Sequence, residues 1–349
     1  MSAKRRYLAS VLDRLGLSRV VLAARARDVY PWRWLTVVTY HRVAEATARG
    51  FDPDVVDASP ADFERQLTML KRYFTLVDTG DLDAWRAGGE LPSNPAMITF
   101  DDGYRDNHDV VLPILKRHDA KAVFFIATSY VTDRRLYWWE HINHVVADSP
   151  LERLILEGDA GAAPQSLELA LSTAGERRAA VKVLLKLVKA EPGLDMDRFL
   201  WALYRAAGLT FDRSDELALA DEMLMSWDHI RSLSKAGMDV QSHSHSHRVL
   251  HTLTPDEVSH DLRRSRAELE AAIDRPVIAL AYPTGRPIRD QPTLRQAVLD
   301  AGYRYGFTVQ RLIPLARIHD WLDIPRMMID RAVSDSFYRS TLAIPSLAY

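Results

Sequence analysis

The segment Thr99-Phe100-Asp101-Asp102-Gly103-Tyr104 places two adjacent carboxylates directly after an apolar, partly β-branched run. That run, 97–100, predicts a short buried strand. Gly103 permits a sharp turn where the strand ends. Adjacent side chains on an extended chain point to opposite sides, so the two aspartates can have different roles. One carboxylate can hold a cation while the other accepts a proton.

A histidine-rich segment, Gln241-Ser242-His243-Ser244-His245-Ser246-His247, also follows an apolar stretch, and His251 comes shortly after it. Neutral imidazoles four residues apart can bind one metal ion from a single helical or turn face. Both His243 with His247 and His247 with His251 have this spacing; we favour the first pair because it is nearest the strand end. Two imidazoles, one carboxylate and positions left for water describe an open catalytic metal site.

The composition limits the class of protein. A chain of 349 residues with 47% apolar side chains can bury one large core or two smaller ones. The formal charge of -2 gives no general attraction to nucleic acid. The absence of cysteine excludes disulfides and thiolate metal ligands. No apolar run approaches the roughly 18 residues that a membrane-spanning helix needs.

Residues 1–33 are expected to form an amphipathic helical segment with a basic start, Lys4-Arg5-Arg6. Charged residues interrupt its apolar positions and no small-residue cleavage site follows, so we do not expect a signal peptide. Two interpretations remain open: the segment packs on its own domain, or it lies on the inner surface of a membrane as a basic helix. The expected location is the cytoplasm, with peripheral membrane contact in the second case.

Strands are predicted near 35–41, 74–77, 97–100, 122–127, 238–241, 277–282, 305–309 and 324–329. Their alternation with helical segments implies parallel pairing and an α/β fold. A parallel barrel collects the residues that follow its strands at one mouth, and here these include Asp101, Asp102, His243, His41 and the Thr284 loop. The predicted barrel comprises 34–133 and 225–335, separated by a helical insertion at 134–224 and followed by a tail at 336–349.

Three motifs resemble those of a known family. Thr99-Phe100-Asp101-Asp102-Gly103 and His243-Ser244-x-x-His247 are similar to the first two motifs of the NodB-type polysaccharide deacetylases, carbohydrate esterase family 4. Ala281-Tyr282-Pro283-Thr284-Gly285 resembles a variant of the third. The resemblance covers roughly 35–135 and 225–335. It implies a distorted (β/α)7 barrel that binds Zn²⁺ or another divalent metal such as Co²⁺, Ni²⁺ or Mn²⁺.

The resemblance also implies residue roles. Asp102, His243 and His247 would be the metal ligands and Asp101 the general base, while the backbone N–H of Thr284 would face the oxyanion. The expected substrate contacts are Tyr104, Tyr282 and Pro283.

Two departures from the family pattern change the assignment of the remaining roles. The usual third motif carries an arginine that steadies the base, and Ala281 stands near that position. The usual late Leu-x-His acid has no clear match; Ile318-His319-Asp320 is the only late His-Asp pair. However, Tyr40-His41-Arg42-Val43 resembles the early Tyr-His-x-Val motif of a branch with circularly permuted motifs, in which the N-terminal histidine is the acid. We therefore expect His41 to be the acid, with His319 as the alternative, and Arg326 to orient Asp101.

The sequence thus predicts a metal-dependent hydrolase that removes N-acetyl groups from an N-acetylated glycan or a lipid-linked sugar. Such an enzyme acts on carbon–nitrogen bonds other than peptide bonds. Two alternatives stay open: hydrolysis of another amide or ester at the same site, and a carbohydrate-binding protein with a degenerate site. Nucleic acid is not an expected partner.

Overall fold

The computed structural model describes residues 3–27, 34–45, 52, 55–158, 166–190, 194–210, 212–309 and 320–347. The chain divides into two compact units. The first, which we call the barrel unit, consists of residues 1–45, 56–132 and 224–349. The second, the insert unit, consists of residues 46–55 and 133–223.

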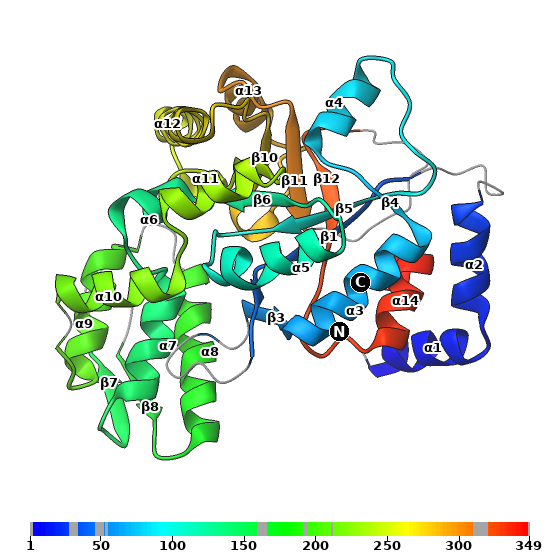
Figure 1. The fold of residues 1–349 in the computed structure, drawn as a ribbon. Helices are drawn as coiled ribbons and strands as arrows, with labels where there is room; N and C mark the ends of the chain where they lie inside the picture. The colour runs from blue at the N-terminus through cyan, green and yellow to red at the C-terminus, as the bar shows by residue number, and fades with distance from the viewer. Residues whose placement is uncertain are drawn as a thin grey trace. The chain divides into compact units, whose positions relative to one another are not determined.

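Seven parallel strands close into a barrel (Figure 1). In spatial order they are β1 (Thr36–Tyr40), β12 (Ile324–Met328), β11 (Tyr305–Val309), β10 (Ala279–Ala281), β9 (Asp239–Ser242), β6 (Val123–Ile126) and β5 (Pro95–Phe100). Pairing of β1 with β5 closes the ring, and the short β4 (Thr75–Leu76) pairs with β5 outside it. The predicted distorted (β/α)7 barrel is confirmed, and each of the eight predicted strand segments is present.

Side chains along each strand alternate between the barrel interior and the surrounding helices, as the two-residue period of a strand requires. On β5, Met97 belongs to the core cluster that also holds Phe125 and Phe307. Its neighbour Ile98 belongs instead to the larger cluster formed with the helices. The barrel interior is therefore a packed core rather than a pore.

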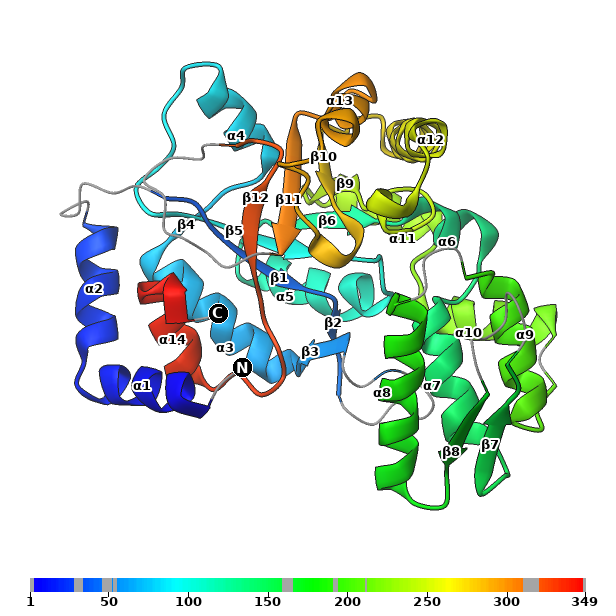
Figure 2. The same ribbon diagram turned by 180° about the vertical axis from the view of Figure 1, so that it is seen from behind.

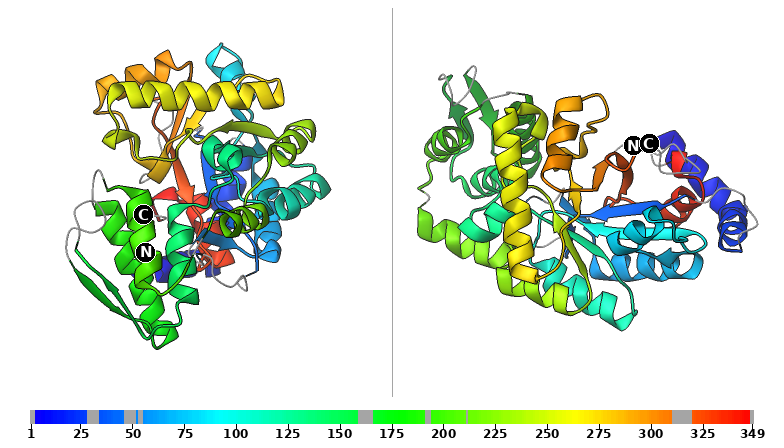
Figure 3. Two further views of the ribbon diagram at one scale, coloured as in Figure 1. Left: turned by 90° about the vertical axis from the view of Figure 1, so that its left-hand side faces the viewer. Right: turned by 90° about the horizontal axis from the view of Figure 1, so that it is seen from above.

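Helices and short turns cover the outside of the barrel. They are α3 (Pro60–Tyr73), α4 (Thr79–Arg86), the π-helical turn η2 (Asn107–Val111), α5 (Leu112–Arg117), α6 (Thr128–Asp133), α11 (Trp227–Lys235), the 3-10 turn η3 (Leu250–Thr252), α12 (Pro255–Ile273) and α13 (Pro292–Asp300). The N-cap residues Ser226 and Thr254 each accept a backbone hydrogen bond at the start of α11 and α12. The long α12 lies beside α13 (Figure 3). A small parallel pair, β2 (Arg42–Val43) and β3 (Val56–Ala58), extends from β1.

The two ends of the described chain meet. α1 (Ala3–Arg14) and α2 (Leu17–Ala26) lie beside α14 (Asp335–Ala343), as Figures 1 and 2 both show. The predicted tail at 336–349 is therefore wrong in its first part, since α14 and the 3-10 turn η5 (Pro345–Leu347) pack into the unit. Six of its nine residues, Phe337, Tyr338, Ser340, Thr341, Leu342 and Ala343, are buried, so α14 is enclosed on most sides. Within the described residues, no helix is long and apolar enough to cross a membrane.

The insert unit contains α7 (Trp138–Asp148), β7 (Arg153–Leu156), β8 (Leu167–Ala170), α8 (Ala174–Ala190), α9 (Met196–Ala206) and α10 (Arg213–Met223). β7 and β8 form an antiparallel pair, so the prediction of a wholly helical insertion is wrong. Leu154, Leu156 and Leu169 are buried while their neighbours are more exposed. That alternation is the pattern of strands with one buried face.

Candidate active site

The strand register brings the predicted site residues to one end of the barrel. Tyr40 of β1 is aligned with Phe100 of β5, and Ser242 of β9 is aligned with Ile126 of β6 and Leu280 of β10. The residues that follow these strands are His41, Asp101, Asp102, His243 and Tyr282. Because parallel strands end at the same edge, these residues share the carboxyl-terminal mouth of the barrel.

Asp102, His243 and His247 each direct a ligand-type atom to one point, with these atoms within 4.8 Å of one another. Asp102 Oδ1 lies 3.4 Å from His243 Nε2 and 3.2 Å from His247 Nε2. His243 Nδ1 is 2.8 Å from the carbonyl oxygen of Ala281. Because a carbonyl only accepts, Nδ1 carries the proton and the lone pair of Nε2 faces Asp102. This is the arrangement that orients a metal-binding imidazole.

The loop after β9 is folded so that the first and fifth of its residues converge. The carboxylate of Asp261 accepts hydrogen bonds from the backbone N–H groups of His245 and Ser246. Ser244 and His247 have φ values of 67° and 53°, and the Ser244 hydroxyl accepts the N–H of His247. The four-residue spacing therefore works here through a turn, since two left-handed residues exclude a continuous helix.

The neighbouring histidines of the same segment have other contacts. His245 Nδ1 lies 2.8 Å from Thr128 Oγ1, and His251 Nε2 lies 3.0 Å from the Pro287 carbonyl oxygen. Of the two pairings left open by the sequence, the structure brings together His243 and His247. Burial lowers the pKa of His247, which favours the neutral ring that a metal requires.

Asp101 lies beside the metal-type cluster and is held by Arg326. Its two carboxylate oxygens accept hydrogen bonds of 2.6 and 2.7 Å from Nη1 and Nη2 of Arg326. Asp101 Oδ2 is also 4.0 Å from His243 Nε2. Burial opposes ionisation of Asp101, but the charge of Arg326 outweighs it and lowers the pKa below its ordinary value. Asp101 is therefore a buried, oriented carboxylate with both oxygens fixed.

His41 follows β1 and is fixed by Asp57, which the sequence reasoning missed. His41 Nδ1 lies 3.0 Å from Asp57 Oδ2, and the same oxygen accepts the His41 backbone N–H at 2.5 Å. Asn107 Nδ2 donates to the His41 carbonyl oxygen at 2.8 Å. Burial alone would lower the pKa of His41, but the carboxylate of Asp57, together with those of Asp102 and Asp101, raises it to about 10. The imidazole is thus protonated at neutral pH, with its ring held from the Nδ1 side.

The loop after β10 exposes one backbone turn. Thr284 is exposed within the 3-10 turn η4 (Pro283–Gly285) and has a φ of 65°, which is unusual for a β-branched residue. Gly285 has a φ of 66°, and a Cβ there would lie 2.5 Å from the Cβ of Val309. Close packing against β11 therefore fixes the turn that carries the Thr284 N–H.

The expected substrate contacts Tyr104, Tyr282 and Pro283 are buried in this structure. The Tyr282 hydroxyl donates a 2.7 Å hydrogen bond to the Leu322 carbonyl oxygen. Exposed side chains of this loop are instead Thr284 and Arg286. The alternative acid His319 lies outside the described residues.

The family model described as polysaccharide deacetylase matches residues 88–152 and 204–306. The match excludes β1 and β12, and with them His41 and Arg326. No curated protein matches the chain.

Several solved structures share the fold. Deacetylase PplD of Streptococcus pyogenes, in complex with acetate, is 18% identical, with a TM-score of 0.55 over 89% of this chain and 99% of that one. IcaB from Ammonifex degensii is 16% identical, with a TM-score of 0.52 over 89% and 97%. BC0361, a polysaccharide deacetylase from Bacillus cereus, is 17% identical, with a TM-score of 0.53 over 89% and 69%. The family model and the shared barrel agree: residues 88–152 and 204–306 match a polysaccharide deacetylase domain.

Proposed function

We propose that the barrel removes N-acetyl groups from an N-acetylated glycan, with a divalent metal, Zn²⁺ in the first instance, held by Asp102, His243 and His247. One observation carries this proposal: the fixed carboxylate of Asp101 lies within 4.0 Å of His243 Nε2, directly beside the three-ligand cluster. A base next to a metal-type site is the arrangement that hydrolysis of an amide by activated water requires.

The donor set fits a divalent metal. Two imidazole nitrogens and one carboxylate oxygen suit Zn²⁺, and three protein ligands leave positions for water and substrate. The Ala281 carbonyl fixes the tautomer of His243 that presents Nε2. When bound, such an ion supplies Lewis-acid polarisation of the acetamide carbonyl and lowers the pKa of water.

The side chains of the chain itself account for the proton transfers. Asp101, ionised and fixed by Arg326, takes the proton of the attacking water. The backbone N–H of Thr284 donates to the developing oxyanion. His41, protonated and held at Nδ1 by Asp57, gives a proton to the departing amine nitrogen. The products are acetate and a free amino sugar.

The substrate class follows from the family rather than from a recognised pocket. PplD is described as a deacetylase in complex with acetate, which is the small product that this reaction would release. We favour an N-acetylated polysaccharide, with a lipid-linked N-acetyl sugar as the second substrate to be tested. Another amide or ester substrate would use the same residues.

The proposal is tested by metal content and acetate release measured on the same preparations. Wild type, Asp102→Ala, His243→Ala and the matched control His251→Ala are compared, with chitooligosaccharides as substrate. We expect near-stoichiometric zinc and acetate release in wild type and His251→Ala, and loss of both in the other two variants. Wild-type protein that binds no divalent metal at any added concentration would contradict the mechanism and favour a carbohydrate-binding role.

A further inference from the structure

The N-terminal helices pack on the barrel unit through one face each. Ala9 of α1 contacts Phe337 and Leu347, and the Ser18 hydroxyl lies 2.8 Å from that of Ser340. Arg25 of α2 donates a 2.7 Å hydrogen bond to the carbonyl oxygen of Leu342. These inward residues fix the rotation of both helices, so their opposite faces point away from α14.

Large apolar side chains are exposed on α1, on α2 and in the turn between them. Tyr7, Leu8, Leu15, Leu17 and Val20 have exposed fractions of 74%, 47%, 69%, 46% and 65%. Of the twelve strongly exposed large apolar residues in the described chain, these five fall within fourteen consecutive positions. We call this set the N-terminal apolar face. A concentration of this kind marks an interaction surface, because single exposed apolar residues are otherwise scattered.

The same segment is strongly basic, although the whole chain has a formal charge of -2. Residues 3–27 contain seven basic residues and one acidic residue, Asp13. Asp13 is already engaged, since it accepts hydrogen bonds of 2.7 and 2.5 Å from Arg339. The charge presented beside the N-terminal apolar face is therefore positive.

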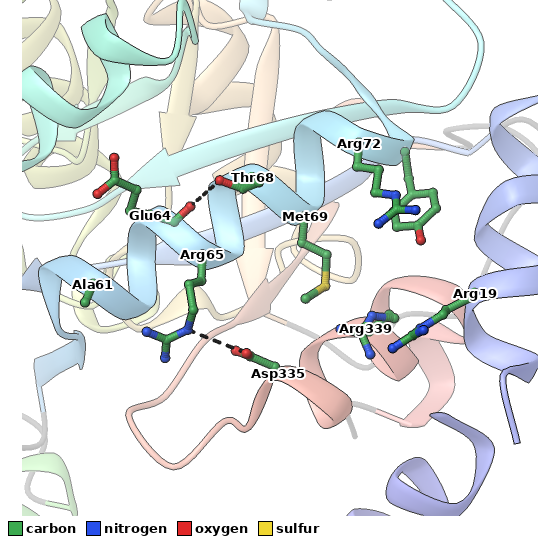
Figure 4. Close-up of a pocket in the computed structure, with 10 residues that line it drawn as sticks. Arg19, Ala61, Glu64, Arg65, Thr68, Met69, Arg72, Asp335 and Arg339 are labelled. Carbon is green, nitrogen blue, oxygen red and sulfur yellow. Dashed lines mark hydrogen bonds and ion pairs between the residues drawn. The ribbon is translucent and has the colours of Figure 1, made fainter. Parts of the chain in front are cut away.

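A cavity of about 540 Å³ opens between α2, α3 and α14 and is lined by four arginines (Figure 4). Arg19 and Arg339 extend toward each other from α2 and α14, and Arg72 comes from α3 above them. Arg65 is engaged by Asp62 and lies 3.5 Å from Asp335.

The two carboxylates that line the cavity, those of Glu64 and Asp335, interact with other side chains. Glu64 accepts hydrogen bonds from Arg117 and His118, and its carboxylate points away from the cavity. Among the described residues, Arg19 and Arg72 have no carboxylate within ion-pair distance. Guanidinium groups from separate helices that converge without enough carboxylates form a site for a phosphate-type anion.

We propose that the N-terminal apolar face binds the surface of an anionic phospholipid membrane, with a lipid phosphate between Arg19 and Arg72. Apolar side chains flanked by arginines are the composition of a helix that lies at the boundary between headgroups and acyl chains. Basic residues add attraction to anionic lipids. A second copy of this chain would present the same positive charge, and that repulsion disfavours self-association through this face.

The test is co-sedimentation with vesicles of neutral phosphatidylcholine and with vesicles that also contain anionic phosphatidylglycerol. We expect wild type to bind the anionic vesicles, with weaker binding at higher salt. Arg19→Gln with Arg72→Gln should weaken partitioning by about fivefold for each charge removed. Leu15→Asp with Leu17→Asp should weaken it by at least about tenfold, because apolar contact is lost and a repelled charge is added.

Matched controls keep the result specific. Leu299→Asp changes an equally exposed leucine on α13, 47% exposed against 46% for Leu17, and should leave vesicle binding unchanged. Arg263→Gln with Arg275→Gln removes two exposed arginines elsewhere and should have little effect. Melting curves by circular dichroism verify that each variant is folded. Absence of wild-type binding, or equal binding to neutral vesicles, would overturn the proposal. So would self-association of wild type that Leu15→Asp with Leu17→Asp abolishes.

Discussion

Arg326 of β12 reaches past β1 to form two parallel hydrogen bonds with Asp101, the residue that follows β5. Both side chains are almost fully buried, at 1% and 4% exposure. A planar guanidinium fixes both oxygens of a carboxylate at once, which a lysine cannot do. The pair therefore sets the orientation and the charge of Asp101 together.

Replacing Arg326 by methionine should destabilise the protein by about 3–5 kcal/mol, because it leaves a buried carboxylate without its cation. Burial would then raise the pKa of Asp101, so the acidic limb of kcat/KM should move to higher pH. Thermal unfolding and a pH–rate profile measure the two effects. The control is Arg295→Met, which breaks another two-bond pair, with Asp320, that is about one-third exposed. It should cost about 1 kcal/mol or less and leave the limb in place.

Asp57→Asn should move the alkaline limb of kcat/KM to lower pH. The mechanism needs His41 protonated, and the carboxylate of Asp57, together with those of Asp102 and Asp101, raises the pKa of His41 to about 10. Without the Asp57 charge, the pKa of His41 should fall toward its ordinary value of about 6.5, because burial is then opposed only by the more distant Asp102 and Asp101. The same raised pKa stabilises the fold below pH about 6.5, and this contribution is lost as pH rises through about 10.

The pH dependence of kcat/KM and the pH dependence of the free energy of unfolding therefore both report on the His41–Asp57 pair. Asp62→Asn, in the nearby α3, provides a control that should leave the alkaline limb unchanged. An unshifted limb in Asp57→Asn would show that His41 is not the acid.

Thr284→Gly should keep activity within a fewfold and raise the free energy of unfolding by about 1 kcal/mol. Thr284 has a φ of 65°, which glycine adopts without the steric cost that a β-branched residue incurs. The proposed oxyanion donor is the backbone N–H, which glycine retains. Thr284→Ala separates the effect of losing the hydroxyl from the effect of relieving the backbone strain, since it removes the hydroxyl but leaves a Cβ at positive φ. A large loss of kcat in both variants would assign the role to the side chain instead.

Zinc should raise the melting temperature of wild type, and a chelator should reverse the increase. A ligand that binds only the native state stabilises it by about 2.7 kcal/mol at roughly 100 times its Kd. Asp102→Ala should show no such shift, whereas His251→Ala should behave as wild type because its ring contacts the Pro287 carbonyl. A shift of equal size in Asp102→Ala would place the ion elsewhere.

The barrel was predictable because its strands are short apolar runs that end in polar loops. The enzyme class is confirmed at the level of the family, since polysaccharide deacetylases act on carbon–nitrogen bonds other than peptide bonds.

The insert unit was less predictable. Leu167 to Ala170 consists of good helix formers, yet the segment pairs with β7 as a strand. Packing of alternate leucines outweighs that local preference, and a composition-based interpretation misses it.

The site was predictable where one motif supplies several groups, as in Asp101 with Asp102 and His243 with His247. Two residues that only position these groups, Asp57 and Asp261, were not predicted. Asp57 lies in a short apolar strand just before the N-cap Ser59, and Asp261 lies within the charged helix α12. An acid inside the apolar run Val56–Ala58 was the sequence signal that could have identified Asp57. Asp261 had no such signal, because α12 contains four other acids, Asp256, Glu257, Glu268 and Glu270, from which the sequence does not distinguish it.

The backbone carbonyl of Ala281 accepts a hydrogen bond from His243, and the Ala281 side chain has no role in the proposed mechanism. The guanidinium that binds Asp101 comes from β12 instead. In a closed barrel, several strands end at similar distances from one mouth. An arginine on one strand can therefore replace an arginine on another strand without changing the chemistry. Loss of a motif residue in such barrels is then no sign of lost catalysis. Relatives with an incomplete third motif are better sorted by whether any strand supplies an arginine to the first aspartate.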